Sequence, residues 1–340
     1  MRPVKRLCVL LSLACLTGLA TAATAATADL DAVLARFDQD EHADLTSVLL
    51  MRDGRIVAER YYNGASADTL HDVRSAGKSI TALLVGTAFD RGLVKPGDTV
   101  GMHWKAARGS AAGALLLDSV LTMRSGLAAF DQDPDSPGNE DKMDEAPDTD
   151  KFILSVPSAS APGSQYRYNS LTSHIAAITV EKAVGQDLER YASEALFAPL
   201  GITRWQWQRD ASGHPKGQGN LSLRTRDLAA IGQLVLDGGV VKGRRVISAA
   251  WLAMMLAPRV AIGEVDRYAD HYGYFWYSKT QHVQGAPLLV HFASGNGGNK
   301  IYVVPSIRAV LVVTSRAYGK GYGQRRSEEI LKAILAATTP

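Results

Sequence analysis

The chain has 340 residues, two cysteines and a formal net charge of +3 at neutral pH. Both cysteines, Cys8 and Cys15, lie in the N-terminal leader described below, so the predicted mature chain has no cysteine nucleophile, disulfide or cysteine metal ligand. Without the three basic residues of that leader, 34 basic residues balance 34 acidic ones, which excludes the basic surface that nucleic-acid binding needs.

The first 28 residues are predicted to be a secretory signal peptide. A basic start precedes an apolar run from Leu7 to about Ala20, and small residues of the Ala-x-Ala kind follow as far as Ala28. The run is shorter than the roughly 20 apolar residues of a membrane-spanning helix. We therefore expect a periplasmic or secreted protein without a membrane span. A lipoprotein anchor at Cys15 is a minor alternative, because the preceding "SLA" fits such a signal poorly.

After the leader, the pattern predicts a hairpin over residues 44–64, with its turn at Asp53-Gly54. A buried helix should follow, with Ile80 and Ala88 on one face and its end at Gly92. From about Val100 the chain becomes mostly helical, broken by clusters of Gly, Pro and Asp. Further elements are expected as helices over 171–184, 225–239, 248–258 and 325–337 and as strands over 287–293, 301–305 and 309–315.

Strands near both ends of the chain, with helices between them, predict an α+β fold in which one antiparallel sheet is built from both termini. The expected division assigns residues 29–100 and 214–340 to a domain with the sheet. Residues 101–213 would form a mostly helical inserted domain. No feature of the sequence predicts the oligomeric state.

The segment "RSAGKSITALLVG" sets Ser75 and Lys78 three residues apart at the start of the first helix, where they share a face. Free backbone N–H groups at a helix start favour negative charge, which helps a serine to act as a nucleophile. A partly desolvated lysine there should have a lowered pKa and could serve as a base. The alternative is that Ser75 caps the helix and Lys78 extends to solvent.

A serine–lysine pair needs a third polar group to carry the proton to the leaving group. The segment "PGSQYRYNSLTSH", residues 162–174, supplies two tyrosines and an Asn-Ser pair directly before a predicted helix. The same residues also fit a helix cap at Asn169 or Ser170 with the tyrosines packed beneath it.

These segments, together with "LLLDSVLTMRSGL" and "FASGNGGNKIYVVP", occur in an order and spacing that resemble the serine β-lactamase and penicillin-binding superfamily. The resemblance covers essentially the whole mature chain. It is strongest to the class C-like branch, and within it to the esterase and 6-aminohexanoate-dimer hydrolase group. It implies a β-lactamase/transpeptidase-like fold.

The resemblance also implies the roles of the site residues. Ser75 would be the acylating nucleophile, Lys78 its base partner and Tyr168 the proton relay, with Tyr166 as the relay if the register of the loop shifts. Ser170 stands where the family usually has Asn. The oxyanion hole would combine the N–H of Ser75 with a second donor at Ser294 or Gly295.

The sequence departs from the β-lactamase branch on the last catalytic strand. That branch has a basic residue followed by Thr-Gly, whereas the equivalent here is Ala293-Ser294-Gly295, with His291 out of register. Lys279-Thr280-Gln281 imitates the motif but is expected in a turn before the strand. Together with Ser170, these changes remove groups that recognise a penicillin and leave the acyl-transfer residues.

We therefore predict a secreted serine hydrolase that forms an acyl-enzyme with carboxylic esters or small amides, and needs no cofactor and no metal. Its partners would be small ester, amide or peptide substrates. One alternative is a D-alanyl-D-alanine carboxypeptidase or β-lactamase, and another is a penicillin-binding-like module with weak catalysis. The acidic segment 131–150 is either a solvated loop or a charged rim that favours cationic or neutral substrates.

Overall fold

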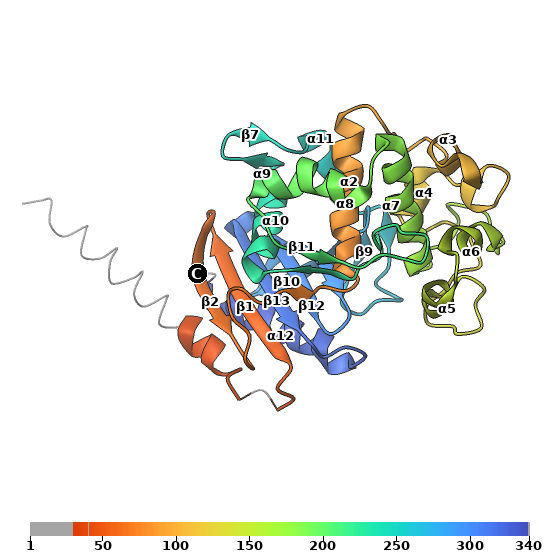
Figure 1. Ribbon diagram of the computed structural model, residues 1–340. Helices are drawn as coiled ribbons and strands as arrows, with labels where there is room; N and C mark the ends of the chain where they lie inside the picture. The colour runs from red at the N-terminus through yellow and green to blue at the C-terminus, as the bar shows by residue number, and fades with distance from the viewer. Residues whose placement is uncertain (1–29, 40, 339–340) are drawn as a thin grey trace, which may run out of the picture.

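The computed structural model describes residues 30–39 and 41–338, so the predicted signal peptide and Cys15 lie outside the described residues. Its centre is an eight-stranded antiparallel sheet in the order β2-β1-β13-β12-β11-β10-β9-β8 (Figure 1). The strands are β1 Leu45–Arg52, β2 Arg55–Tyr61, β8 Val260–Ala261, β9 His271–Tyr272, β10 Tyr277–Val283, β11 Ala286–Gly295, β12 Asn299–Val304 and β13 Ala309–Ser315. The pairing of β1 with β13 confirms that segments from both ends of the chain build one sheet.

The predicted hairpin of β1 and β2 is confirmed, with Asp53 and Gly54 at φ 47° and 73° in its turn. Two positive φ angles match the right-handed twist of the flanking strands, which explains the Asp-Gly pair. The expectation of a turn at Lys279-Thr280-Gln281 is wrong. These residues lie inside β10 and pair with Val290, Leu289 and Leu288 of β11, and the turn of this second hairpin follows at Gln284-Gly285.

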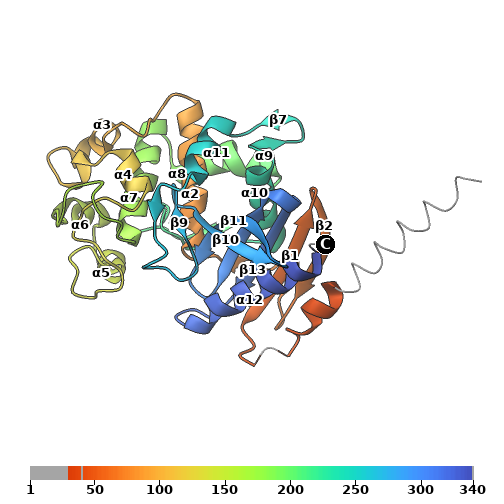
Figure 2. The ribbon, with the colours of Figure 1, turned by 180° about the vertical axis from the view of Figure 1, so that it is seen from behind.

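Helices cover both faces of the sheet (Figures 1 and 2). On one face, α2 (Ala76–Asp90) contacts β11 and α10 (Thr225–Leu236) contacts β12 and β13. On the other, α12 (Gly321–Thr338) contacts β10, β12 and β13. Gly232 of α10 allows close packing, since a Cβ there would lie 2.5 Å from Val310. Apolar side chains from both helix layers and the sheet form the core.

Short helices and loops extend the fold beside α2 (Figure 1). The helices of this region are α3 Val100–His103, α4 Leu117–Leu121, α5 Glu140–Glu145, α6 Thr149–Ser155, α7 Ser170–Val184, α8 Leu188–Ala192 and α9 Ala198–Leu200, with 3-10 turns at Lys105–Ala107 and Ala112–Ala114 and a π-turn at Ser193–Phe197. Among the described residues, no helix is both long and apolar enough to cross a bilayer. The division at residues 101 and 213 into two domains stays a prediction.

The remaining elements connect the two regions. A three-stranded sheet joins β3 (His71–Asp72) to β5 (Leu221–Leu223) and β4 (Gln206–Trp207), so the chain just before α2 pairs with a strand more than a hundred residues later. The hairpin of β6 (Val240–Val241) and β7 (Arg244–Arg245) leads into α11 (Ala249–Leu256), which packs against α2. As a result α2 is buried on all sides from Ala76 to Ala88.

Candidate active site

Ser75 stands at the junction between β3 and α2. Arg74, directly before it, has φ 50°, a conformation that costs energy for a residue other than glycine and often marks functional sites. A Cβ at Gly219 would lie 2.6 Å from the Arg74 carbonyl oxygen, so this turn needs glycine beside it. Ser75 occupies the N-cap position of α2, but its side chain makes no capping hydrogen bond, so the alternative that its hydroxyl caps the helix is wrong.

Lys78, on the first turn of α2, has only 1% of its surface exposed, so the alternative that it extends to solvent is also wrong. Its Nζ donates hydrogen bonds to Ser75 Oγ at 3.0 Å, Ser170 Oγ at 3.2 Å and the Gln218 carbonyl oxygen at 2.9 Å. An ammonium has three donors. These three acceptors therefore fix the nitrogen beside the serine hydroxyl.

The lowered pKa that we expected for Lys78 is wrong. Burial does disfavour its ammonium form, but the neighbouring Tyr168, which is negative when it is ionised, and the charges of Glu140 and Asp131 outweigh burial and raise the pKa of Lys78. The surroundings of Lys78 thus favour its protonated form. Sequence reasoning considered only the burial of Lys78 and left out the opposing effects of Tyr168 and of Glu140 and Asp131, two acids from a distant segment.

The two candidate tyrosines lie in different surroundings. The Lys78 Nζ lies 5.0 Å from the centre of the Tyr168 ring. Tyr166 instead packs edge-on against Tyr272, with ring centres 5.3 Å apart, and burial raises its pKa well above the usual value. Tyr272 and Tyr277 continue this aromatic cluster. Of the two hydroxyl-bearing rings, Tyr168 is therefore the one beside the serine–lysine pair.

Ser170 begins α7 and is fully buried. Its Oγ accepts from Lys78, and its backbone N–H donates to Asp131 Oδ2 at 2.7 Å. The cap of this helix is Asn169, whose side chain accepts the Thr172 N–H at 2.7 Å. The start of α7 thus carries both the structural cap and a hydrogen-bond partner of Lys78, on adjacent residues.

Asp131 is a site residue that sequence reasoning did not single out. Burial and the charge of Glu140 raise its pKa to about 6, against the opposing effect of Lys78. Its second carboxyl oxygen, Oδ1, is buried without a hydrogen-bond partner in the structure. The only sequence signal was its position as the first acid of the segment 131–150.

Several other acids of that segment have structural partners. Asp144 pairs with Lys216 at 2.8 Å, and Asp148 caps α6 by accepting the Lys151 N–H. Asp150 contacts His214 at 3.2 Å. Five of the nine acids of the segment are exposed, so the interpretation as a solvated segment holds for most of its charge. Asp131 and Glu140 are the acids whose charges act on Lys78.

The end of β11 lies against the start of α2. A Cβ at Gly295 would lie 2.0 Å from the Val73 carbonyl oxygen, so no larger residue fits. Because side chains alternate along a strand, Ser294 points to the opposite face, where its Oγ accepts a hydrogen bond from Lys300 Nζ at 2.6 Å. Ser294 can therefore act in the site only through its backbone.

The backbone at the end of β11 offers an open edge, since the last residue of β11 paired with β10 is Phe292. The Gly295 carbonyl accepts from the Gly298 N–H at 3.1 Å and from Gln324 Nε2 at 2.8 Å. The described chain has no cis peptide bond, so the Asn296 N–H points opposite to that carbonyl. It thus faces the open edge rather than β12.

Lys300 offers a stability test at this strand. It is 3% exposed, and burial lowers its pKa to about 8. Between pH 8 and the ordinary pKa of 10.5, this lysine is protonated in the unfolded chain but mostly neutral in the folded one. The unfolded chain therefore binds more protons in that range, and burial of the amine lowers the free energy of unfolding by its full amount below pH 8. We expect Lys300→Met to raise the free energy of unfolding by about 1–3 kcal/mol at neutral pH.

That gain in the free energy of unfolding should shrink as the pH rises from about 8 to about 10, because the destabilisation that the buried Lys300 amine causes in wild type declines over this range. Urea unfolding of both proteins at several pH values measures it. A gain of equal size at every pH would show that repacking, and not the buried charge, is responsible.

Three comparisons relate this geometry to known proteins. The family model described as Beta-lactamase matches residues 30–335. A 6-aminohexanoate-dimer hydrolase of Paenarthrobacter ureafaciens is 28% identical over 245 residues, which span 67% of this chain and 62% of that protein. The match thus covers somewhat less than two thirds of the length of this relative.

Solved structures share the fold. The hydrolase EstCE1, described as having promiscuous acyltransferase activity, superimposes with a TM-score of 0.73 at 14% identity, over 94% of this chain and all (100%) of its own. A class C beta-lactamase from Rhodobacter sphaeroides gives a TM-score of 0.64 at 17% identity, over 92% and 99% of the two chains. At such identities the likeness establishes the architecture only.

Proposed function

Because the chain belongs to the Beta-lactamase family of serine hydrolases, we propose that it hydrolyses carboxylic esters or small amides through an acyl-enzyme on Ser75. The observation that carries the proposal is the 3.0 Å contact between Lys78 Nζ and the Ser75 hydroxyl, at a strained turn where that hydroxyl is not used as a helix cap. A nucleophile next to a group that can take part in proton transfer is the signature of covalent catalysis.

In this proposal, Ser75 Oγ attacks the substrate carbonyl carbon and its proton passes to the Lys78–Tyr168 pair. To accept this proton, the pair must carry one proton fewer than its fully protonated form. The pair then gives the proton to the leaving oxygen or nitrogen as its bond to the carbonyl carbon breaks. Water attacks the acyl-enzyme by the reverse proton path and releases the acid.

We assign the oxyanion hole to the backbone N–H of Ser75 and that of Asn296. From the sequence we expected the second donor at Ser294 or Gly295. The carbonyl of Gly295 is turned toward Gly298, and in an extended strand the N–H of the same residue points the same way. Asn296 is favoured because the two hydrogen bonds of the Gly295 carbonyl fix its N–H toward the open edge.

Two features bear on the substrate class: the acidic residues near Lys78, and the absence of a basic residue at position 293 of β11. Ala293 stands where the β-lactamase branch has a basic residue, so a substrate carboxylate lacks that partner. Asp131 and Glu140 add negative charge near Lys78. Esters and amides that are neutral or cationic around the acyl group should therefore bind better than penicillins.

A panel of substrates tests this proposal. Purified protein is assayed with p-nitrophenyl butyrate, a p-nitroanilide, nitrocefin and a D-Ala-D-Ala peptide. We expect Ser75-dependent turnover of the ester or the anilide, with kcat/KM at least about 100-fold above that for nitrocefin. Faster turnover of nitrocefin or of the peptide than of both small substrates would contradict the proposed substrate class.

We further propose that the enzyme is exported to the periplasm or secreted, on the basis of the leader at residues 1–28. Appearance of an N-terminus near Asp29 in protein recovered from the periplasm or the medium supports export. Full-length protein retained in the cytoplasm contradicts it.

A further inference from the structure

One loop connects the surface of the protein to the proposed catalytic lysine. This loop, residues 208–220, contacts α2 twice: the Gln218 carbonyl accepts from Lys78 Nζ at 2.9 Å, and the Gly217 carbonyl accepts from Thr81 Oγ1 at 2.8 Å. At Gly217 a Cβ would lie 2.1 Å from the Cβ of Ala177 in α7, so the loop is pressed between the two buried helices. The position of Lys78 Nζ thus depends on the position of this loop.

A fully buried histidine of α7 holds the inner part of the loop. The Gly217 N–H donates to His174 Nδ1 at 3.1 Å, which makes Nδ1 an acceptor and puts the ring proton on Nε2. Nε2 then donates to Asp210 Oδ2 at 2.7 Å. Both nitrogens of the His174 ring therefore bond to residues of the same loop, Gly217 and Asp210. These two hydrogen bonds fix the conformation of the loop, and neither needs a charged imidazole.

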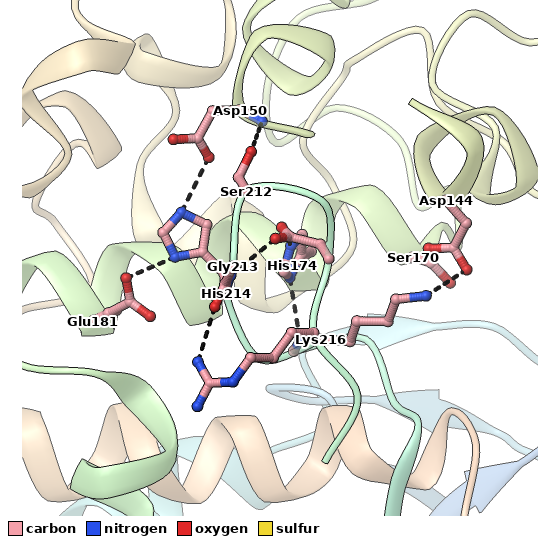
Figure 3. Close-up of polar contacts among 12 residues, drawn as sticks. Asp144, Asp150, Ser170, His174, Glu181, Ser212, Gly213, His214 and Lys216 are labelled. Carbon is pink, nitrogen blue, oxygen red and sulfur yellow. Dashed lines mark hydrogen bonds and ion pairs between the residues drawn. The ribbon is translucent and has the colours of Figure 1, made fainter. Parts of the chain in front are cut away.

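The outer part of the loop is held by charge. His214 lies between two carboxylates, with Nδ1 2.7 Å from Glu181 Oε1 of α7 and Nε2 3.2 Å from Asp150 Oδ1 of α6 (Figure 3). Burial alone would lower the pKa of His214, but the close contacts with Asp150 and Glu181 raise it to about 9. The ring is therefore an imidazolium at neutral pH and forms an ion pair with each acid.

The other charged groups that face His214 act less directly. Lys182, next to Glu181 on α7, opposes the imidazolium, and Asp210 of the loop favours it. Asp210 also accepts the backbone N–H of His214 at 2.9 Å. Together with Asp150 and Glu181, these groups come from α6, α7 and the loop. The positive charge of His214 therefore attracts acidic residues of three segments.

We propose that His214 is a positioning residue for Lys78: its charged contacts with Asp150 and Glu181 hold the 208–220 loop so that the Gln218 carbonyl keeps Lys78 Nζ on Ser75. When His214 loses a proton, its ring keeps only one N–H group. One of the two carboxylates, Asp150 or Glu181, then faces a ring nitrogen without a proton, and neither carboxylate has a cation in His214. The loop then relaxes, and the Gln218 carbonyl is no longer held beside Lys78 Nζ. This inference rests on the proposed function of Ser75 and Lys78.

The test is the rate at which a fluorophosphonate acylates Ser75, followed by intact mass. His214→Gln keeps a hydrogen-bonding side chain but removes the charge. We expect it to react about tenfold more slowly than wild type near pH 7.5, as a small displacement of Lys78 implies. The ratio should fall toward one near pH 10, because wild type loses the imidazolium above its pKa.

A matched control and a second variant separate positioning from stability. Arg226→Gln removes another ion pair, Arg226–Glu59 at 2.6 Å, which joins α10 to β2 and includes no residue of the loop, and should react like wild type. Glu181→Gln leaves His214 with Asp150 alone, so the alkaline fall in rate should move to lower pH. This variant keeps the proposal testable if His214→Gln does not fold.

The outcomes are distinct. A His214→Gln protein that reacts at the wild-type rate, or more slowly by a constant factor at every pH, overturns the positioning role while the proposed function stands. Lower thermal stability with no change in the acylation rate does the same. A wild-type protein that the reagent does not label overturns the proposed function itself.

Discussion

The Ser75→Ala variant is expected to lose turnover by at least about 10⁴-fold while its stability stays near that of wild type. The activity falls because no other group can form the acyl-enzyme. The stability is kept because the Ser75 hydroxyl makes no capping hydrogen bond, so its removal leaves no helix N–H unpaired. Steady-state rates and thermal melts of the two proteins measure both effects.

Ser79→Ala is the matched control, one turn further along α2. Ser79 is buried, and its Oγ donates to the Phe275 carbonyl at 2.5 Å. Its removal should lower the free energy of unfolding by about 1–2 kcal/mol and leave kcat nearly unchanged. If Ser75→Ala instead cost stability and spared activity, Ser75 would be a structural residue.

Lys78→Met is the second change with a large expected effect. It removes the cation beside Ser75 but keeps most of the side-chain volume, so kcat should fall by about 10³-fold or more. KM should change little, because Lys78 contacts the serine and not the bulk of the substrate. Full kinetics on the preferred ester provide the measurement.

Lys279→Met tests the specificity of that effect. Lys279 belongs to the Lys-Thr-Gln sequence that imitates a catalytic motif, but its Nζ pairs with Glu328 of α12 at 3.3 Å, on the face of the sheet opposite α2. We expect kcat within about twofold of wild type for this variant, since this partly exposed ion pair lies away from Ser75 and contacts no residue of the proposed site. Equal losses in the two lysine variants would contradict the assignment of Lys78.

The parts of the fold that the sequence predicts well are those with strong local signals. Asp53-Gly54 between apolar runs predicts a hairpin, and the buried apolar run after Ser75 predicts α2. β10 was missed because Lys279, Thr280 and Gln281 are polar, although Gln281 is buried in the sheet. Tertiary pairing overrides weak local preference there.

For the site, local motifs predict which side chains are brought together but not what surrounds them. Ser75 and Lys78 share a helix face, so their contact follows from spacing. The Gln218 carbonyl has no sequence signature, because every residue has a carbonyl. Asp131 lies 53 positions from Lys78 in the printed numbering, and its effect on the lysine pKa needs the folded chain.

The most direct test of the account is the intact mass of wild type and Ser75→Ala after exposure to a fluorophosphonate, with peptide mapping of the adduct. The account predicts one adduct on wild type, located on Ser75, and none on the variant, with turnover of p-nitrophenyl butyrate lost in parallel. An adduct on another residue, or equal labelling of the two proteins, would contradict Ser75 as the nucleophile.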